Sequence, residues 1–282
     1  MHCHRIEGST QLYGVIGWPL TQSLSPLLHN TAFADLGLPA LYQRWEVPPE
    51  RLPLFVDSVR LLRIQGCSVT IPHKTPILTL IDAVRPLAKR AGAVNTLFWQ
   101  DGQLCGENTD IAGFLAPLEQ ECLAGEAALV LGAGGASRAV ALGLTSLPEA
   151  RRPATVYVTT PSDKRHLPLA EEFGLVPLPW KERHEPRVRL VINATPLGMH
   201  GATEAETPYD FTLCPAPPEG LAYDIVYNPL ETRFLRQARQ TGRRCIGGLE
   251  MFYGQANAQF RLWTGRSLPE AARQALENAL SS

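Results

Sequence analysis

The chain has 282 residues, of which 45% are hydrophobic and 19% are charged, and its formal charge is −1. This length favours two domains over one, and the composition is that of an ordinary globular protein rather than a disordered or fibrous chain. The most basic stretch, residues 181–189, is interleaved with acidic residues, so we expect a solvated surface loop there. We therefore expect no nucleic-acid partner.

Six cysteines are scattered through the chain without any Cys-x-x-Cys pair. We expect them to be small buried hydrophobic residues in a reducing compartment. Residues 1–4 contain three potential metal ligands, but they stand at a chain terminus with no second cluster, so we predict a frayed end and no metal site. There is no signal-peptide pattern and no run of 18 apolar residues, so we expect a cytoplasmic protein without a membrane partner.

The first 122 residues alternate between strand and helix patterns, which is typical of an open α/β unit. Ser25 is the expected N-cap of the first helix and Pro26 its first helical residue. The dipeptide Asp101-Gly102 predicts a hairpin turn. We predict strands at residues 11–18, 42–47, 66–71, 94–99 and 104–106, and helices at residues 27–36, 49–63, 75–84, 86–91 and 110–122.

A second α/β unit follows, and two amphipathic helices at residues 251–264 and 269–280 end the chain. We expect these last helices to return to the first domain, which would then comprise residues 1–112 and 249–282, with residues 113–248 as the second domain. The loop at residues 196–218 is expected to be irregular. The predicted strands are residues 127–131, 155–159, 175–178, 190–193, 221–225 and 245–246, and the predicted helices are residues 137–147, 167–173 and 232–241.

Residues 127–138, AALVLGAGGASR, predict a buried strand, a tight turn and the start of a helix. This geometry presents backbone N–H groups at a helix N-terminus to a pyrophosphate. Gly132 would make the turn and Gly134 would let phosphates approach, whereas Ser137 stands where a third small residue is usual. The pattern indicates a nucleotide site, with a plain βα turn as the alternative.

Two polar stretches follow predicted strands of the first half. Ser23 and Ser25 lie two residues apart, so they either bind one anionic group together or cap the next helix. Residues 68–74, SVTIPHK, place Thr70 and Lys74 at one edge of the sheet, where α/β sheets bind ligands. A lysine at this edge is either part of a site or an ordinary surface charge.

Two more polar stretches lie further along the chain. Residues 93–96, AVNT, are followed by residues 107–110, ENTD, in which Asp110 either belongs to a site or caps the helix that it precedes. Residues 248–251, GLEM, are followed one turn later by Gln255.

Eight stretches in one order resemble the shikimate dehydrogenase family: SLSPLLHN, SVTIPHK, AGAVNT, GENTD, GAGGASR, INATPLGM, YDIVYNP and GGLEMFYGQA. The resemblance runs from Tyr13 to about Trp263. It implies an N-terminal α/β substrate domain, a Rossmann domain for NADP and C-terminal helices that return to the first domain. It also implies reversible hydride transfer between NADPH and the C3 carbonyl of 3-dehydroshikimate, in aromatic amino-acid biosynthesis, by a monomer or homodimer.

The resemblance also assigns roles to individual residues. Lys74 and Asp110 match the catalytic pair, although proton transfer by Lys74 and purely electrostatic positioning of the substrate oxygen both remain open. The residues that match substrate contacts are Ser23, Ser25, Thr70, Asn95, Tyr227 and Gln255. The residues predicted to bind the cofactor are Gly132, Ala133, Gly134, Gly135, Ala136, Ser162, Arg165, Thr195, Gly248 and Met251.

The chain departs from the family pattern in two places. Ser68 replaces a common Asn, and Pro161 replaces the Arg that usually clasps the 2′-phosphate of NADP. Because Arg165 matches a second basic contact and no acidic residue ends the strand, we expect NADP, with NAD as the alternative. A quinate/shikimate dehydrogenase that uses NAD is thus the second hypothesis. A non-catalytic protein that binds NADP(H) or shikimate is the third, and the presence together of Lys74, Asp110, Asn95 and Gln255 disfavours it.

Overall fold

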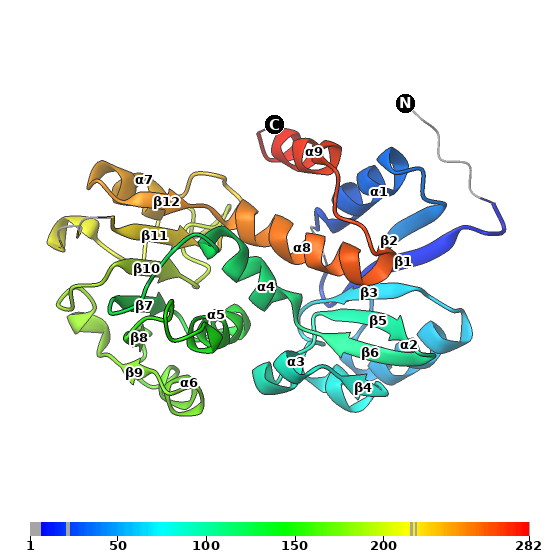
Figure 1. Ribbon diagram of the computed structural model, residues 1–282, viewed down its shortest axis with the longest axis horizontal. Helices are drawn as coiled ribbons and strands as arrows, with labels where there is room; N and C mark the ends of the chain where they lie inside the picture. Colours follow the sequence, from blue (N-terminus) through cyan, green and yellow to red (C-terminus); the bar gives the residue numbers. More distant parts are fainter. Residues whose placement is uncertain (1–6, 21–22, 215–216, 218, 282) are drawn as a thin grey trace. The chain divides into compact units, whose positions relative to one another are not determined.

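The computed structural model describes residues 7–20, 23–214, 217 and 219–281, and the chain divides into two compact units (Figure 1). The first unit comprises Met1–Thr109 and Gln255–Ser282, and the second comprises Asp110–Gly254. The potential metal ligands within residues 1–4 lie outside the described residues. Among the residues that the structure describes, no helix is long and apolar enough to cross a membrane.

A mixed six-stranded sheet forms the centre of the first unit, in the order β2-β1-β3-β5-β6-β4. Strand β1 is parallel to both of its neighbours, so the chain leaves its carboxyl end at a reversal of strand order. Ligands of open α/β sheets bind at such a point. The strands are β1 (Gln11–Gly17), β2 (Ala40–Glu46), β3 (Gly66–Val69), β4 (Ala83–Val84), β5 (Thr96–Gln100) and β6 (Gln103–Glu107).

The helices of the first unit confirm the predicted return of the C-terminal segment. Helix α9 packs against α1, and the Trp263 indole near the end of α8 donates a hydrogen bond to Leu97 O at 2.9 Å. The C-terminal residues from Gln255 onward therefore complete the core of the first unit. The helices are α1 (Ser25–Asp35), η1 (Pro49–Arg51), α2 (Leu52–Leu61), η2 (Pro76–Thr79), α3 (Pro86–Ala91) and α9 (Glu270–Ser281), together with the part of α8 (Gly248–Thr264) from Gln255 onward.

Two local predictions for the first unit are wrong. Residues 75–84 form the short η2 and the strand β4 instead of one helix, because Asp82 exchanges two hydrogen bonds with Leu104 that hold this segment against β6. Ser25 is the first residue of α1, not its N-cap. The oxygen that accepts a bond from the Ser25 amide is Ser23 Oγ, at 3.3 Å.

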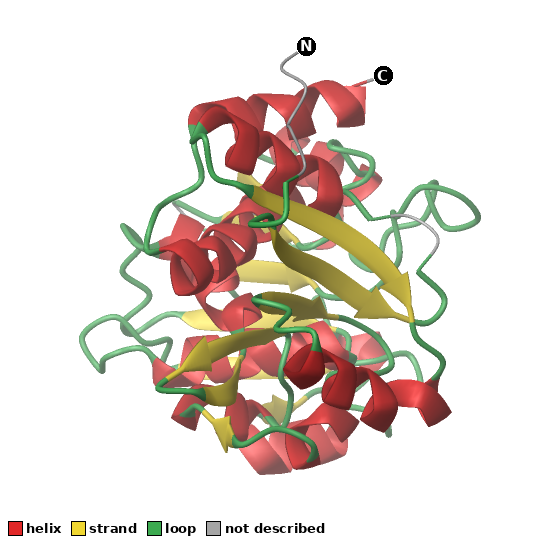
Figure 2. Cartoon of the chain, turned by 90° about the vertical axis from the view of Figure 1, so that its right-hand side faces the viewer, coloured by secondary structure: helices red, strands yellow, loops and turns green. Residues whose placement is uncertain are grey.

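A fully parallel six-stranded sheet forms the second unit, in the order β12-β11-β10-β7-β8-β9. This is the strand order of a Rossmann domain, and it reverses between β7 and β10. In the chain as a whole, helices flank the strands (Figure 2). The strands are β7 (Ala127–Leu131), β8 (Thr155–Thr159), β9 (Val176–Pro177), β10 (Leu190–Asn193), β11 (Leu221–Asp224) and β12 (Arg244–Ile246). The helices are α4 (Thr109–Leu115), η3 (Ala116–Leu118), α5 (Gly135–Ser146), α6 (Leu167–Phe173), η4 (Trp180–Glu182), η5 (Phe211–Leu213) and α7 (Arg233–Gln240).

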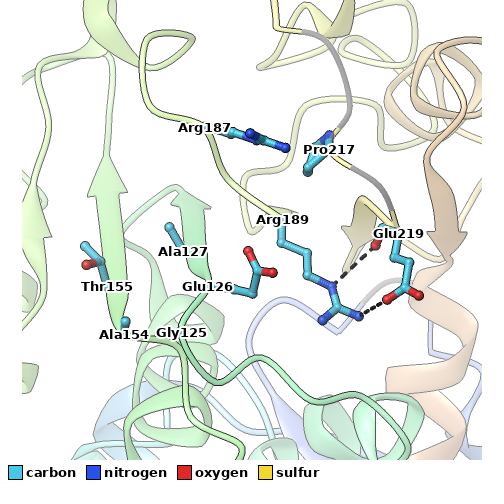
Figure 3. A pocket seen from close by; sticks show the side chains of 9 residues that line it. All are labelled: Gly125, Glu126, Ala127, Ala154, Thr155, Arg187, Arg189, Pro217 and Glu219. Atoms are coloured by element: carbon cyan, nitrogen blue, oxygen red, sulfur yellow. Dashed lines mark hydrogen bonds and ion pairs between the residues drawn. The ribbon is translucent and has the colours of Figure 1, made fainter.

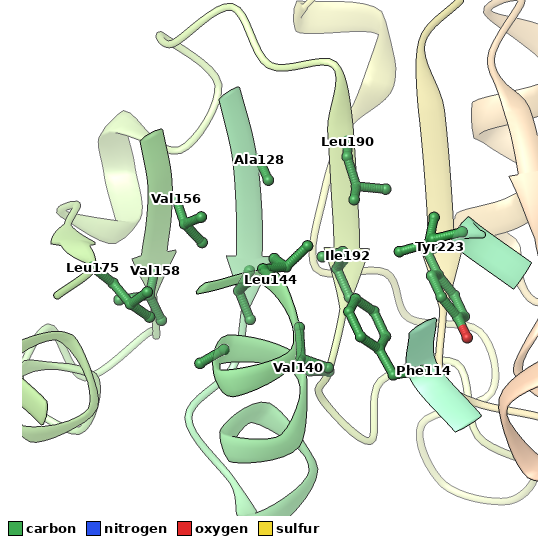
Figure 4. Packing of buried hydrophobic residues seen from close by; sticks show 14 of the residues in the cluster. Phe114, Ala128, Val140, Leu144, Val156, Val158, Leu175, Leu190, Ile192 and Tyr223 are labelled. Carbon is green, nitrogen blue, oxygen red and sulfur yellow. The ribbon is translucent and has the colours of Figure 1, made fainter. Parts of the chain in front are cut away.

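Both faces of the parallel sheet are buried, which explains the continuous apolar runs of its strands. On one face, Phe114 stacks on Tyr223 with ring centroids 5.1 Å apart, beside Val140 of α5 (Figure 4). On the other face, Phe211 packs edge-on against Phe234 of α7 at 4.9 Å. The parallel sheet is thus enclosed between two apolar layers.

Several predictions for the second unit need correction. The helix expected over residues 110–122 stops at Leu115, because Pro117 lacks an N–H and its ring clashes with the preceding turn. The segment at residues 181–189 is not simply solvated, since the Arg189 side chain is 11% exposed and ion-paired with Glu121 at 3.1 Å. Cys122 is exposed, contrary to the expected burial of the cysteines.

The loop at residues 196–218 is also less irregular than expected. It contains η5, whose Phe211 belongs to the core. Three of its residues, 215, 216 and 218, lie outside the described part of the chain.

Candidate active site

In the first unit, the predicted substrate residues follow the carboxyl ends of β1 and β3. Gly17, the last residue of β1, lies close to Thr70, the first residue after β3. A Cβ atom on Gly17 would lie 2.6 Å from Thr70 Cγ2. The Thr70 amide donates to Ile16 O at 2.9 Å, and Thr70 O accepts from the His73 amide at 2.9 Å. Thr70 is thereby held at the sheet edge where the chain turns toward Lys74.

Lys74 is tied through its backbone to the segment that precedes β5. Its carbonyl oxygen accepts a hydrogen bond from the Val94 amide at 2.8 Å, which brings Lys74 beside Asn95. The neighbouring His73 is fully buried, and its Nε2 lies 2.7 Å from Val47 O. His73 therefore anchors the turn, while the half-buried Lys74 is the residue of this pair that a ligand can reach.

Asn95 is buried, and hydrogen bonds fix the orientation of its carboxamide. Its Oδ1 accepts from Thr96 Oγ1 at 2.8 Å and from the Thr109 amide at 2.7 Å. These donors occupy the amide oxygen, and the Nδ2 group of the same carboxamide is a donor. Asp110 follows Thr109 directly in the chain and is the first residue of the second unit.

In the second unit, the glycine-rich turn lies at the reversal of strand order. Gly132 has φ +114°, and a Cβ atom there would lie 2.7 Å from Ala194 O, so the fold itself requires glycine. Among the described residues, apart from chain neighbours and the backbone of the helix itself, nothing lies within 4 Å of a Cβ atom placed on Gly134 or Gly135. This open space lies at the N-terminus of the twelve-residue helix α5, so the turn fits a pyrophosphate group.

Ser137, which stands where a third small residue is usual in the fingerprint, has a structural role in this turn. It is fully buried, and its Oγ accepts a hydrogen bond from the Gly134 amide at 3.1 Å. This bond satisfies one amide of the helix start, as a capping side chain does. The departure from the usual fingerprint therefore stabilises the turn.

A buried network around the Asp224 carboxylate lies beside this turn, and neither Asp224 nor Asn193 is among the predicted site residues. Asn193 Nδ2 donates to Asp224 Oδ1 at 3.0 Å, while Asn193 Oδ1 accepts from Thr195 N at 3.0 Å and from Thr195 Oγ1 at 2.7 Å. Thr232 Oγ1 donates to the second oxygen of Asp224 at 2.5 Å. The network holds Thr195, a predicted cofactor contact, at the carboxyl end of β10. The available sequence signal was a polar residue ending each of two adjacent apolar strands.

Burial raises the pKa of Asp224 to about 7, against the hydrogen bonds from Thr232, Val226 and Asn193, which favour the charged form. Between about pH 4 and pH 7 the carboxyl is then protonated only in the folded chain. The free energy of unfolding is therefore expected to fall as pH rises through this window, by up to about 4 kcal/mol from this group, and to change no further above it.

The variant Asp224→Asn should flatten this part of the pH dependence, as measured by urea unfolding at pH 4.5 and 7.5. Asp57→Asn is the matched control, because its side chain is 77% exposed. An equal pH dependence in the wild type and Asp224→Asn would contradict the prediction.

The segment after β8, where the adenosine end of a dinucleotide binds in this fold, is held by its own polar groups. Ser162 Oγ lies 3.3 Å from Thr160 Oγ1 and accepts from the Arg165 amide at 3.2 Å. The Asp163 carboxylate accepts from the Trp180 amide at 2.7 Å. The Arg165 side chain is exposed.

The remaining predicted residues lie where β11 leads toward α8. Tyr227 is half-buried against Phe252, with ring centroids 4.9 Å apart, and burial raises its pKa. A Cβ atom on Gly248 would lie 2.4 Å from Val226 O, so packing alone requires a glycine there. Met251 belongs to the core of the second unit, and Gln255 begins the C-terminal part of the first. Their contacts with ligands remain predictions.

A separate hollow of about 540 Å³ opens at the opposite, amino edge of the parallel sheet (Figure 3). Ala127 and Thr155, the first residues of β7 and β8, line it together with Arg189 and Glu219. The Arg189 guanidinium is already paired with Glu219 at 3.3 Å and with Glu121. Its charge is thus balanced, and the candidate cofactor residues lie at the other edge of the sheet.

Comparisons with known proteins agree with this arrangement. Residues 15–97 match the model of the shikimate dehydrogenase substrate binding domain, and residues 248–277 match that of the shikimate 5'-dehydrogenase C-terminal domain. The shikimate dehydrogenase (NADP(+)) of Pelobacter propionicus is 52% identical over 96% of this chain and 97% of its own. The chain belongs to the shikimate dehydrogenase family.

Solved structures of this family have the same fold. One is a shikimate 5-dehydrogenase of Thermus thermophilus in complex with NADP(H) and shikimate, with TM-score 0.84, 41% identity, and coverage of 96% of this chain and 100% of that chain. Another is a shikimate 5-dehydrogenase of Listeria monocytogenes in complex with shikimate and NAD, with TM-score 0.84, 29% identity, and coverage of 98% and 99%. The α/β fold with a Rossmann unit is therefore confirmed.

Proposed function

We propose that the protein is an NADP-dependent shikimate dehydrogenase, which reversibly reduces 3-dehydroshikimate to shikimate in aromatic amino-acid biosynthesis. The observation that carries this proposal is the placement of Thr70, Lys74 and Asn95 at one edge of the first sheet. A glycine turn suited to a pyrophosphate lies at the reversal of the second sheet. We assign the first unit to the substrate and the second to the dinucleotide. Relatives with this activity match almost the whole chain.

When bound to the second unit, NADPH would supply a hydride for the substrate carbonyl carbon. Negative charge then develops on the carbonyl oxygen, and the Lys74 ammonium is the group assigned to stabilise or protonate it. Asp110 is assigned as the second catalytic residue. Both proton transfer and electrostatic positioning by Lys74 are consistent with a half-buried lysine at the sheet edge.

The substrate-binding assignments follow the hydrogen-bonding capacity of each side chain. Ser23 and Ser25, at the start of α1, are assigned to the carboxylate, together with Tyr227. Thr70, Asn95 and Gln255 are assigned to ring hydroxyls. Protein groups that hydrogen-bond the ring hydroxyls would be left without a partner if an analogue lacked one of these hydroxyls. We therefore expect strong discrimination against deoxy analogues of the substrate.

The segment after β8 supports NADP over NAD. The carboxylate of Asp163, the first acidic residue after β8 in the sequence, already accepts a hydrogen bond from the Trp180 amide. Arg165 has an exposed side chain and lies on the same turn as Ser162, whose hydroxyl is a second candidate contact for the 2′-phosphate. We therefore propose NADP as the preferred cofactor, despite Pro161 at the position of the usual arginine.

The variant Arg165→Ala is expected to raise KM for NADP⁺ about tenfold and to leave KM for NAD⁺ nearly unchanged, because only NADP⁺ carries the 2′-phosphate. Arg187→Ala is a matched control, since Arg187 is an exposed arginine that lines the hollow at the opposite sheet edge. Equal effects of Arg165→Ala on both cofactors would remove Arg165 from the phosphate site.

The proposed function is tested by kcat/KM for shikimate and for quinate, each with NADP⁺ and with NAD⁺. The proposal expects the shikimate and NADP⁺ pair to give the highest value. A higher value with NAD⁺ and comparable turnover of quinate would instead support a quinate/shikimate dehydrogenase. Absence of turnover with all four pairs would leave the hypothesis of a non-catalytic binding protein.

We also propose a cytoplasmic location, because the five described cysteines are all free, as expected in a reducing compartment. For the oligomeric state we propose a monomer or a homodimer. Sedimentation velocity of the purified chain distinguishes the two.

A further inference from the structure

A continuous chain of buried polar side chains crosses the core of the first unit. The Tyr42 hydroxyl donates to Ser68 Oγ at 2.7 Å, and Ser68 Oγ donates to Gln259 Oε1 at 2.9 Å. Gln259 Nε2 then donates to Thr96 Oγ1 at 3.0 Å and to Asn95 O at 3.3 Å. Residues that are up to 191 positions apart in the sequence are thus joined by one hydrogen-bonded path.

The members of this chain are shielded from water. Tyr42 is 2% exposed, Ser68 is 7% exposed and Gln259 is 1% exposed. A buried polar group that loses its partner cannot recover the lost bond from solvent. A satisfied buried network therefore fixes the positions of its members, because each hydrogen bond depends on the next.

The two ends of the chain meet residues that the proposed function assigns to the substrate. At one end, Ser25, which is assigned to the carboxylate, lies near the Tyr42 hydroxyl and lowers its pKa, against the larger opposing effect of burial. At the other end, Gln259 holds the backbone of Asn95, and Thr96 holds the Asn95 amide oxygen at 2.8 Å. Both residues are assigned to parts of the substrate, the carboxylate and a ring hydroxyl.

Gln259 also ties α8 to the sheet. It lies four residues after Gln255, and residues at this spacing share one face of a helix. The hydrogen bonds from Gln259 to Ser68 of β3 and to Thr96 of β5 therefore fix the helix turn that carries Gln255. They set its distance from the sheet and its rotation about the helix axis.

The network is uncharged over the physiological pH range. His29, whose ring stacks on Tyr42 with centroids 4.5 Å apart, has its pKa lowered to about 3 by burial. Burial also raises the pKa of Tyr42. Positioning by this network should consequently not vary with pH between about 6 and 9.

We propose that Gln259 and Ser68 form a positioning pair that sets the spacing between the carboxylate and ring-hydroxyl contacts, and so determines substrate specificity. Neither residue is proposed to touch the substrate. The inference rests on the proposed function. It also gives a role to Ser68, the position where the family commonly has Asn, because a hydroxyl can accept from Tyr42 and donate to Gln259 at once.

The test compares Gln259→Leu, Ser68→Ala and the double variant with the wild type. Gln274→Leu is the matched control, because Gln274 is exposed on α9 of the same unit. We expect Gln259→Leu to raise KM for shikimate about tenfold or more, with a smaller change in kcat and with KM for NADP⁺ within about twofold of the wild type. Discrimination against a shikimate analogue lacking one ring hydroxyl should also weaken.

The double variant tests whether Gln259 and Ser68 act together. If both residues act through their shared hydrogen bond, the increase in KM of the double variant should be smaller than the product of the two single increases. If Gln259→Leu does not fold, Ser68→Ala and Tyr42→Phe, which each remove one hydroxyl, are judged by the same criteria.

A folded Gln259→Leu variant with an unchanged KM for shikimate would overturn the proposal, as would equal shifts in KM for shikimate and NADP⁺. Turnover by the wild type is measured first, because it distinguishes a failure of the proposed function from a failure of the positioning pair. A wild type that oxidises shikimate, with variants that match it, contradicts only the positioning pair. A wild type without turnover contradicts the proposed function, and the positioning pair with it.

Discussion

The variant Lys74→Ala is expected to lower kcat for shikimate oxidation about 10³-fold while KM for shikimate changes less than about threefold. In the proposed role, Lys74 would meet charge that is largest on the substrate oxygen in the transition state, so its loss should affect the chemical step more than ground-state binding. Steady-state kinetics with saturating NADP⁺ measure both constants. Lys89→Ala, at an exposed position of α3, is the matched control.

An increase in KM alone, at unchanged kcat, would show that Lys74 binds substrate without a catalytic role. Lys74→Arg distinguishes the two catalytic roles, because arginine keeps the positive charge but does not release a proton at neutral pH. Retention of about a tenth of kcat or more in Lys74→Arg would favour electrostatic positioning. A loss as large as that of Lys74→Ala would favour proton transfer.

The sequence predicts the strands β7, β8, β10 and β11 of the second unit well because they are apolar runs in which most residues are buried. Residues 127–131 and 155–159 have the boundaries observed for β7 and β8. In contrast, residues 75–84 are short and ambiguous, and the choice between helix and strand is made by Asp82 and Leu104, which are distant in sequence. Local periodicity carries no information about such a contact.

In the candidate site, too, local motifs predict some residues, whereas others depend on contacts between distant parts of the chain. Motifs locate Lys74, Asn95 and the glycine turn, because each lies within a few residues of a predicted strand end. The residues that hold Asn95 and Thr195 in place are not predicted. Gln259 contacts Ser68 across 191 residues, and Asp224 contacts Asn193 across 31, so local motifs do not show that these side chains pair, although Asn193 and Asp224 each end an apolar strand. Supporting contacts of this kind become visible only when the sheets are assembled.

The glycine turn gives the last prediction, because its glycines are required for different reasons. Gly132→Ala should destabilise the fold by about 2 kcal/mol or more, since φ is +114° and the new Cβ would lie 2.7 Å from Ala194 O. Gly135→Ala should leave the melting temperature unchanged or slightly higher, because open space surrounds the new Cβ and alanine favours the helix.

The same Gly135→Ala variant should nevertheless weaken NADP⁺ binding about 30-fold, because a pyrophosphate on the N-terminus of α5 would occupy the space into which the methyl group projects. Isothermal titration calorimetry with NADP⁺ measures this without turnover. Gly8→Ala, whose new Cβ atom would also meet none of the described residues within 4 Å, is the control outside the second unit. Wild-type affinity in Gly135→Ala would place the pyrophosphate elsewhere. Weak binding with an intact fold would show that the space before α5 is kept open for the cofactor and not for packing.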